Sequence, residues 1–295
     1  MVQIALVGAG RIGLPVARHL VAAGHAVRVQ DVRAEVEHQA RDFGATWGEP
    51  LPETDVLVTV LPGSPELRAL MLDESGLLNR LRPGTTWLDL TSASPALGAE
   101  LAAAADHHRI DYLESPVGGG PDAAEAGALT LYVAGDSTTF DRLQPILQAF
   151  AKQLHYTGPH GSGYLTKLLV NLLWFNQVVA VGEVLMLGQS GGLDPLRLRQ
   201  ILLSGPAASA FIQDVVPRML AGDQLATFGL DRIVEELGSI EDFARLHEVP
   251  AALTSLVTAV HRDALAYFGP AAGELLAFTH LWATAGWDTE LPGNP

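Results

Sequence analysis

The stretch Val2–Asp31, VQIALVGAGRIGLPVARHLVAAGHAVRVQD, decides the fold of this chain. Val2–Val7 is a short apolar run that stops at a glycine, as expected for a strand buried in a parallel sheet. A glycine-rich turn, Gly8–Gly13, follows it, and a helical pattern comes next. A second strand-like run begins at His25, and Asp31 stands directly after it. The sequence therefore predicts a strand–helix–strand unit.

The glycines of the turn have separate tasks if this unit binds a dinucleotide. Gly8 permits the tight turn, Gly10 lets the backbone approach a pyrophosphate, and Gly13 lets the helix pack closely on the strand. The helix N-terminus offers backbone amides and a positive dipole end to the phosphates. The predicted cofactor-binding residues of the turn are Gly8, Ala9, Gly10, Arg11, Ile12 and Gly13. A plain strand–turn–helix, with glycines for packing alone, is the alternative.

Asp31 and its neighbours bear on which dinucleotide binds. We expect Asp31 to accept hydrogen bonds from the adenosine ribose and to repel a 2′-phosphate, which favours NAD over NADP. Arg28 and Arg33 weaken this preference, since a nearby arginine can accommodate the phosphate, so NADP stays possible. Val32 and Arg33 are predicted to complete this end of the cofactor site.

Composition limits the remaining classes of function. At 295 residues, with 48% hydrophobic and 17% charged residues, the chain is long enough for one large or two medium globular domains. Its net charge of −15 argues against binding to nucleic acid or to anionic membranes. The chain has no cysteine, and the adjacent His107 and His108 point apart, so no metal site is expected. Because the first strand begins within three residues of Met1, we expect no signal peptide and a cytoplasmic location.

Strand and helix patterns go on alternating to about residue 160. Further strands are expected at Asp55–Leu61, Thr86–Leu90, Ile110–Glu114, Leu129–Ala134 and Leu154–Thr157. This alternation predicts a mostly parallel, doubly wound sheet, which binds ligands beyond the C-terminal ends of its strands. Leu61, Pro62 and Ser92 follow such strand ends and are predicted to line the cofactor crevice.

Three consecutive glycines, Gly118, Gly119 and Gly120, come shortly after the strand expected at Ile110–Glu114. The bare N–H groups of such a run form a nest for a carboxylate or phosphate, and a flexible turn is the alternative. Because they follow the same strand ends as the cofactor turn, we predict that the three glycines bind substrate.

The second informative stretch is Gly161–Gly192, GSGYLTKLLVNLLWFNQVVAVGEVLMLGQSGG. It is mostly apolar and free of proline, which suits a helix buried on most sides. A 3.6-residue period places Lys167 and Asn171 one turn apart on one face, with Trp174 a turn further. By itself this pattern fits a core helix whose lysine extends from the first turn to water. A membrane span is a second alternative, against which the polar residues spread round the helix argue.

The rest of the chain has helical patterns throughout. Helices are expected to start at Asp194-Pro195, Thr227, Pro250 and Pro270, with shorter segments near 209–220. The polar tail, residues 288–295, is expected to fray.

Taken together, these motifs resemble the β-hydroxyacid dehydrogenase family, which includes 3-hydroxyisobutyrate dehydrogenase and tartronate semialdehyde reductase. The motifs are GAGRIGLPVARHL at 8–20, LP at 61–62, DLTSASP at 89–95, SPVGGGPDAAEAGALTLYVAG at 115–135 and GSGYLTKLLVN at 161–171. The resemblance implies an NAD(P)-binding Rossmann domain at 1–160, an interdomain helix at 161–192, and an all-helical substrate and dimerisation domain at 193–295. It also implies a homodimer formed through the C-terminal helices.

The activity implied by the resemblance is reversible, NAD(P)-dependent oxidation of small β-hydroxy acids. The family's catalytic lysine falls on Lys167 and its companion asparagine on Asn171. Lys167 would donate a proton to the developing alkoxide in reduction and remove the hydroxyl proton in oxidation. Partial burial is expected to lower its pKa from ~10.4 toward roughly 7–8. Trp174 would line an apolar part of the substrate pocket, unless it is a core residue.

The chain departs from the family pattern at three places. Gly118 stands where a serine is usual, Glu235-Glu236 where a Lys-Asp pair is usual, and Val170 where an asparagine or histidine is common. Glu235 is therefore predicted to bring an anion to the substrate site. An imine reductase acting on a cationic iminium is the close alternative, against which Lys167 argues. A non-catalytic NAD-binding protein is the third possibility, and the retained lysine argues against that as well.

Overall fold

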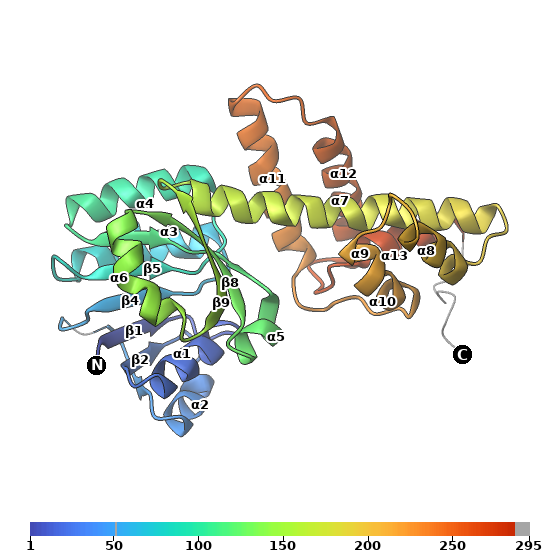
Figure 1. Ribbon diagram of the computed structural model, residues 1–295. Helices are drawn as coiled ribbons and strands as arrows, with labels where there is room; N and C mark the ends of the chain where they lie inside the picture. The colour runs from blue at the N-terminus through green and yellow to red at the C-terminus, as the bar shows by residue number, and fades with distance from the viewer. Residues whose placement is uncertain (51, 287–295) are drawn as a thin grey trace. The chain divides into compact units, whose positions relative to one another are not determined.

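The computed structural model describes residues 1–50 and 52–286, and the chain divides into two compact units, Met1–Lys167 and Leu168–Pro295. Figure 1 shows the elements of both units. The tail at 288–295, for which fraying was predicted, lies outside the described residues.

The first unit begins with the predicted strand–helix–strand. It consists of β1 (Gln3–Val7), α1 (Gly13–Ala22) and β2 (Ala26–Gln30), and the two strands pair in parallel with Val7 opposite Gln30. Successive side chains of β1 enter different cores, because a strand points alternate residues to opposite faces. Ile4 and Leu6 pack on one face of the sheet, and Ala5 and Val7 pack on the other.

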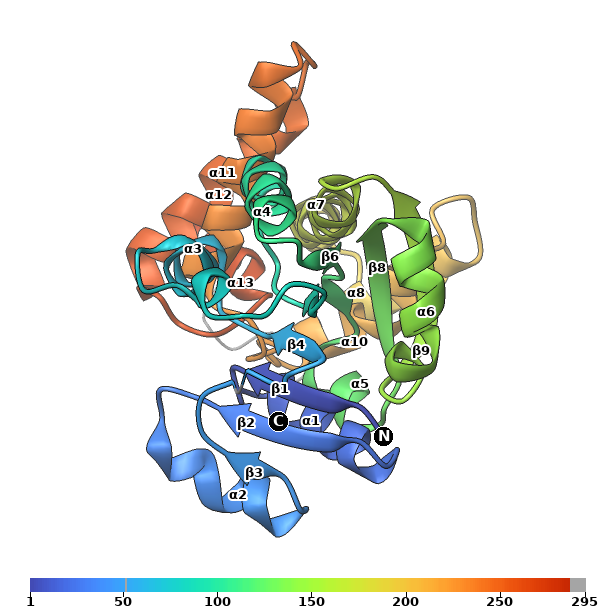
Figure 2. The same ribbon diagram turned by 90° about the vertical axis from the view of Figure 1, so that its left-hand side faces the viewer.

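A nine-stranded sheet extends from this unit. The further strands are β3 (Thr46–Trp47), β4 (Val56–Thr59), β5 (Thr86–Asp89), β6 (Asp111–Glu114), β7 (Val117–Gly118), β8 (Leu129–Gly135) and β9 (Ala151–Gly158). Their order is β3-β2-β1-β4-β5-β6-β8-β7, and β9 pairs with β8 (Figure 2). The strands from β3 to β6 are parallel, and β8 runs antiparallel to β6 and β7. The mostly parallel sheet is confirmed. β3 and β7 were not predicted, since two residues are too few to show a period.

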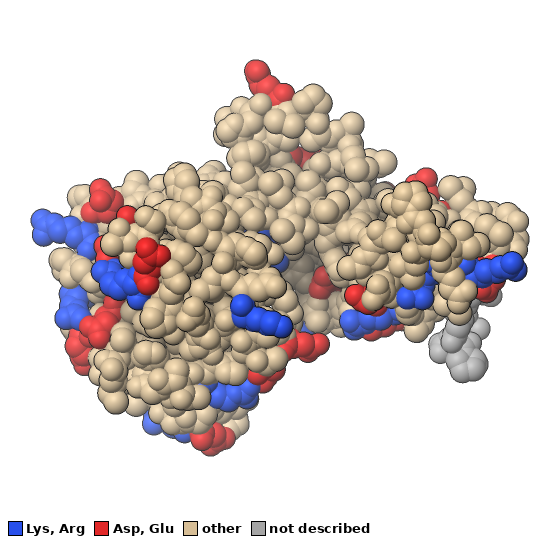
Figure 3. Space-filling view, in the orientation of Figure 1, with Lys and Arg blue, Asp and Glu red and all other residues tan. Residues whose placement is uncertain are grey.

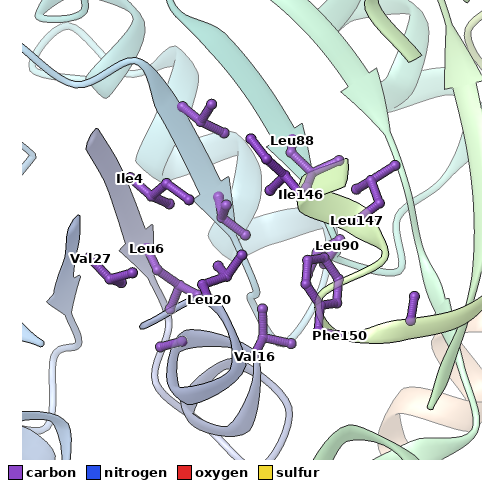
Figure 4. Packing of buried hydrophobic residues seen from close by; sticks show 14 of the residues in the cluster. Ile4, Leu6, Val16, Leu20, Val27, Leu88, Leu90, Ile146, Leu147 and Phe150 are labelled. Atoms are coloured by element: carbon purple, nitrogen blue, oxygen red, sulfur yellow. The ribbon is translucent and has the colours of Figure 1, made fainter. Parts of the chain in front are cut away.

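Helices cover both faces of this sheet, as the doubly wound prediction requires. They are α2 (Glu37–Asp42), α3 (Ser64–Leu72), α4 (Pro95–His107), α5 (Gly120–Glu125) and α6 (Ser137–Leu147), with 3₁₀ turns at Ala34–Val36 and Leu77–Asn79. On one face α1, α2, α5 and α6 pack against the strands, and Figure 4 shows Val16 and Leu20 of α1 beside Leu6 of β1. On the other face α3 and α4 enclose a core that also receives Tyr164.

The long helix α7 (Ser162–Ser190) occupies almost the whole of the range predicted for it. Among the described helices it is the one that is long and apolar enough to cross a membrane, although core helices of soluble proteins pass the same test. Given 100° per residue, four of the five large apolar side chains found exposed among its described residues gather on one side: Leu169, Leu173, Val184 and Leu187. The fifth, Val170, lies about 100° round the helix from Leu169. Lys167 and Asn171 lie on the opposite side of the same helix by that geometry.

The second unit is helical. After α7 it contains α8 (Pro195–Leu203), α9 (Ala210–Asp214), α10 (Val216–Leu220), α11 (Leu230–Leu246), α12 (Ala252–Phe268) and α13 (Leu276–Thr284). Their apolar faces enclose one core, in which Phe175 and Val178 of α7 join residues from α9 to α13. Asp194 caps α8 as predicted, accepting a hydrogen bond of 2.8 Å from the backbone N of Arg197.

Two helix starts fall later than the pattern indicates. The hydroxyl of Thr227 donates to Glu274 instead of capping a helix, and α11 begins at Leu230. Likewise, the segment after Pro270 pairs with the chain just before α11: Leu230 N donates to Ala271 O and Gly273 N donates to Phe228 O. The backbone groups used in these bonds delay the start of α13 to Leu276.

Candidate active site and cofactor site

The glycine turn divides into residues that the fold requires and one that it does not. Gly8 has a φ of +101°, and a Cβ there would lie 2.1 Å from the carbonyl oxygen of Val60. A Cβ on Gly13 would lie 1.8 Å from the carbonyl oxygen of Gly8. At Gly10 the nearest atom to a Cβ would be a guanidinium nitrogen of Arg33, 4.0 Å away. Space for a ligand is therefore left at Gly10, which fits a pyrophosphate approaching the backbone.

Asp31 lies beside this turn as an ionised hydrogen-bond acceptor. Its carboxylate accepts from Ala9 N at 2.7 Å and from the backbone N and Nε of Arg33 at 2.9 and 3.0 Å. Burial raises the pKa of Asp31, but the hydrogen bonds from Arg33 and Ala9 outweigh it and hold the pKa below its ordinary value. The side chain is 7% exposed, whereas Arg33 is half exposed.

The two arginines near Asp31 have different surroundings. Arg33 Nη2 donates to Ala9 O at 3.2 Å, so its guanidinium lies against the glycine turn. Arg28 Nε donates to the carbonyl of Glu49 at 2.9 Å. Val32, which was predicted to contribute to this end of the site, is fully exposed.

The ends of β1, β4 and β5 come together next to the turn. A Cβ on Gly8 would lie 3.4 Å from Leu61 Cδ2, and Leu61 N donates to Thr91 Oγ1 at 3.1 Å. Ser92 and Pro62 follow directly on these contacts in the chain. In the strand order, β1 lies between β2 and β4, which is the point where chain connections reverse and where ligands bind in such sheets.

A buried polar row crosses the same sheet edge, and the sequence did not indicate it. Thr59, Asp89 and Glu114 end neighbouring strands and stand opposite one another in register. All three are fully buried, and the Thr59 hydroxyl donates to Asp89 Oδ1 at 2.5 Å. Burial raises the pKa of Asp89 to about 6, although hydrogen bonds from Thr59, Tyr164 and Thr91 oppose the rise.

The first turn of α7 rests on this row. The Tyr164 hydroxyl donates to Asp89 Oδ2, and Tyr112 Oη lies 2.6 Å from Tyr164 Oη. Glu114 accepts from the backbone N of Gly161 and, at 3.2 Å, from that of Tyr164. Burial raises the pKa of both tyrosines well above the ordinary value, and the carboxylate of Asp89 adds to the effect. The two phenols are therefore neutral donors.

The triple glycine does not form one uniform loop. Gly118 belongs to β7 and stands opposite Thr130, whereas Gly119 and Gly120 have φ of +103° and +66° and begin α5. A Cβ on Gly118 would lie 3.2 Å from Tyr132 Oη. The role of these glycines in binding substrate stays a prediction.

Lys167 and Asn171 are both half-buried and one turn apart in α7. In the second unit Asn171 Nδ2 donates to Glu236 Oε2 at 2.7 Å, and Glu236 is 8% exposed. Glu235, the residue selected from the sequence, instead pairs with Arg232 at 2.9 Å. Adjacent residues on a helix point about 100° apart, so the two acids of α11 have different neighbours. The prediction that Glu235 brings an anion to the substrate site stays a prediction.

Trp174 packs edge-on against Phe211, with ring centroids 5.1 Å apart, and borders the core of the second unit. Its indole Nε1 is buried, with no hydrogen-bond partner among the described residues. Core packing accounts for these contacts, and a place for Trp174 at the substrate stays a prediction.

The charged groups are dispersed. On the face shown in Figure 3, acidic and basic side chains lie near one another over the first unit. Ion pairs in that unit include Arg142–Asp111 and Arg18–Glu125. Within residues 1–50 and 52–286 no group of three or more histidine or acidic side chains is placed to hold a metal ion.

Comparisons with known proteins agree with this arrangement. Residues 3–158 match the NAD-binding domain of 6-phosphogluconate dehydrogenase, and residues 161–280 match the NAD-binding domain of NADP-dependent 3-hydroxyisobutyrate dehydrogenase. An NAD-dependent L-serine dehydrogenase of Pseudomonas aeruginosa is 31% identical over 68% of this chain and 69% of its own. A solved 3-hydroxyisobutyrate dehydrogenase of Mycobacterium tuberculosis, with L-serine, superimposes with a TM-score of 0.86 at 27% identity, covering 95% of this chain and 99% of that one.

The fold, the cofactor turn and these matches together define an NAD(P)-dependent dehydrogenase. The chain belongs to the β-hydroxyacid dehydrogenase family, in which 3-hydroxyisobutyrate dehydrogenase is found. In that family setting α7 is part of a soluble enzyme fold. An imine reductase from a Pseudomonas species, covering 94% of this chain and 98% of its own with a TM-score of 0.59 at 16% identity, shares the fold alone.

Proposed function

We propose that the protein is an NAD-preferring dehydrogenase of small β-hydroxy acids in which Lys167 is the general acid and base. The observation that carries the proposal is the position of Lys167, one turn after a helix start anchored on the C-terminal strand ends of the nucleotide-binding sheet. Bound at that sheet edge, the nicotinamide supplies or accepts the hydride. Lys167 is one of two lysines in the chain, and the other, Lys152, is exposed on β9.

In reduction the ammonium of Lys167 donates its proton to the oxygen of the carbonyl that becomes an alcohol. In oxidation the neutral amine removes the hydroxyl proton from the same oxygen. A lysine near its ordinary pKa of ~10.4 is too weakly dissociated for the second role, so we expect a lowered pKa for Lys167.

Asn171 has a defined orientation in this scheme. A carboxylate only accepts hydrogen bonds, so the amide nitrogen of Asn171 faces Glu236 and its Oδ1 is the acceptor end. Oδ1 would then orient the Lys167 ammonium, one turn earlier on the same helix. Glu236 holds Asn171 in that orientation, so we include it among the site residues beside the predicted Glu235.

NAD is preferred in this proposal because the Asp31 carboxylate is already ionised and directed at the glycine turn. A 2′-phosphate brought beside that carboxylate would be repelled. Arg33 opposes the preference, but its guanidinium is paired with Asp31 itself. We therefore expect NAD to bind more tightly than NADP, by a margin smaller than an unpaired aspartate would give.

The oligomer and the domain division belong to the same proposal. Of the sixteen large hydrophobic residues found exposed in the described chain, thirteen lie after residue 168, on the helical unit. We propose that these residues form a homodimer interface. The proposed domain division is 1–160 for the nucleotide-binding domain, 161–192 for the interdomain helix and 193–295 for the helical domain. The enzyme is proposed to act in the cytoplasm.

The substrate is tested with a panel assayed with both cofactors by absorbance of the reduced nicotinamide. The panel contains 3-hydroxyisobutyrate, L-serine, their semialdehyde counterparts and a five-membered cyclic imine. Turnover of a hydroxy acid with NAD supports the proposal. Turnover of the imine alone would favour the imine reductase alternative, which the buried acid beside Asn171 and the missing hydroxyl at Gly118 support.

Lys167 is tested by substitution against a matched lysine. Lys167→Ala should lower kcat by about 10²–10⁴-fold with NAD binding unchanged, because only proton transfer is removed. Lys167→Arg should be as slow, since an arginine keeps its proton at any working pH. Lys152→Ala is the control and should keep full activity. Full turnover by Lys167→Ala would remove the proposed role.

A further inference from the structure

The start of α7 is held by residues far away in the sequence. A side-chain cap usually comes from the residue just before the helix, as Asp194 caps α8. In α7 the capping acceptor is Glu114, which ends strand β6 some fifty residues earlier and accepts from the N–H groups of Gly161 and Tyr164. A cap supplied by a strand fixes the position of the helix on the sheet, besides satisfying its first amides.

A second hydrogen bond connects α7 to the neighbouring strand, β5. The Tyr164 hydroxyl donates to Asp89 at the end of β5, and Asp89 is itself fixed by the hydroxyl of Thr59 from β4. Trp87 Nε1 donates to that same hydroxyl at 2.9 Å. Three adjacent strands are thus linked by buried hydrogen bonds to one helical turn, and water cannot replace these bonds because the groups are fully buried.

Packing around the turn is close on two sides. A Cβ on Gly163 would lie 2.7 Å from the carbonyl oxygen of Tyr132, so α7 is in close contact with β8 at this point. On the other side, a Cβ on Gly98 of α4 would lie 2.8 Å from the Tyr164 ring. Two glycines therefore allow α4, α7 and β8 to close around Tyr164 and Glu114.

We propose that Tyr164 and Glu114 are positioning residues that set where Lys167 stands relative to the strand ends holding the cofactor. Lys167 comes three residues after Tyr164, so a rotation or lift of the first turn moves it directly. This inference rests on the proposed role of Lys167 in catalysis. A displacement of about 1 Å at a catalytic group can cost on the order of 10²-fold in rate.

The test substitution is Tyr164→Phe, which keeps the ring in its packed place and removes the tie to Asp89. We expect kcat for the hydroxy acid turned over by the wild type to fall by about 10- to 100-fold, with KM and the Kd for NAD within about twofold. The pKa of Lys167 should change as well. It can be followed by ¹³C-methyl NMR after reductive methylation in a Lys152→Arg background, where Lys167 is the one remaining lysine.

Tyr112→Phe is the matched control. Tyr164 has a single hydroxyl proton, which it donates to Asp89, so Tyr112 must be the donor in the bond between the two phenols. The control removes a buried hydroxyl but leaves the hydrogen bonds from the start of α7 to Glu114 and Asp89 in place. It should lower the Tm while leaving kcat and the Lys167 pKa unchanged.

The outcomes separate the inference from the proposed function. Full turnover by Lys167→Ala overturns the proposed function itself. An inactive Lys167→Ala, together with Tyr164→Phe that keeps wild-type kcat and Lys167 pKa despite a lower Tm, overturns the positioning role alone. Should Tyr164→Phe fail to fold by circular dichroism, Glu114→Gln provides the decision. In that variant the side-chain NH2 group faces one backbone N–H at the start of α7, and because both are donors one hydrogen bond of the cap is lost. An unchanged kcat and an unchanged Lys167 pKa in Glu114→Gln would reject the inference.

Discussion

At Gly13 an added methyl group would lie 1.8 Å from a backbone oxygen, whereas at Gly10 it would lie 4.0 Å from the nearest atom. Glycine is therefore needed at these two positions of one motif for two different reasons. Gly13 is required by the packing of α1 on β1, and Gly10 is accounted for by a ligand. The sequence motif predicted both tasks, but only the surroundings show that they are separable.

The two glycines make a matched pair for mutation. Gly10→Ala should fold with an unchanged Tm and bind NAD about tenfold or more weakly, because the methyl group occupies space needed by the pyrophosphate. Gly13→Ala should destabilise the protein by ~3 kcal/mol, because backbone must move to admit the methyl group. Calorimetric titration with NAD and urea unfolding measure the two effects. Equal losses of stability in both variants would contradict the assignment.

Residue-scale contacts cannot be read from the sequence where neighbouring residues diverge in space. Glu235 and Glu236 are indistinguishable as a pair of acids, yet one pairs with Arg232 and the other with Asn171. Asp89 and Glu114 read as ordinary ends of strands, since nothing local shows that they lie in register or that a helix rests on them.

At the scale of elements, the buried polar row at the ends of β4, β5 and β6 contains a titratable acid, Asp89. Asp89 has a pKa of about 6 in the folded protein, against an ordinary value of 3.8. Between these two values the folded state binds more protons than the unfolded state. The contribution of Asp89 to the free energy of unfolding therefore falls as the pH rises from about 4 to about 6, by on the order of 3 kcal/mol.

The change in the free energy of unfolding with pH that Asp89 contributes can be measured by removing its carboxyl group. In Asp89→Asn the contribution disappears, so the stability of the variant relative to wild type should rise between pH 4 and pH 6 and stay level above that range. Urea unfolding at matched pH values gives the difference, with Asp141→Asn, an exposed acid on α6, as the control. A pH-independent difference between Asp89→Asn and wild type would show that Asp89 titrates normally.

The starts of the helices show which boundaries are set by residues nearby in the sequence. Asp194 caps α8 as predicted, and Ser94 caps α4 in the same way, because a cap needs only the next three residues. Thr227 has the same local signature, but Glu274, distant in the chain, takes its hydroxyl. A competing partner of that kind cannot be found from a local pattern.

At the scale of the whole molecule, the exposed apolar stripe on α7 needs an explanation. Leu169, Leu173, Val184 and Leu187 face away from the side that carries Lys167. Exposed stripes of this size are typical of interfaces between proteins. The proposed homodimer would cover them and would explain why a helix of a soluble enzyme has the composition of a membrane span.

The dimer is tested by light scattering. We expect twice the chain mass of 31.3 kDa for the wild type and a shift toward the monomer in Leu173→Glu/Leu187→Glu, since two carboxylates would be buried in the interface. Lys152→Glu, which also changes charge at an exposed position but on β9, should remain dimeric. A wild-type mass of one chain would refute the proposal.

The sequence by itself determined the strand–helix–strand unit, the mostly parallel sheet, the long helix and the family, because each depends on a period or on a motif within a few tens of residues. The tertiary structure alone decided that Thr59, Asp89 and Glu114 form one row and that Tyr164 joins α7 to it. It also decided that Glu236, and not Glu235, contacts Asn171. These contacts join residues that are tens of positions apart in the chain. They arise from strand register and helix packing, which the assembled fold sets and no single segment encodes.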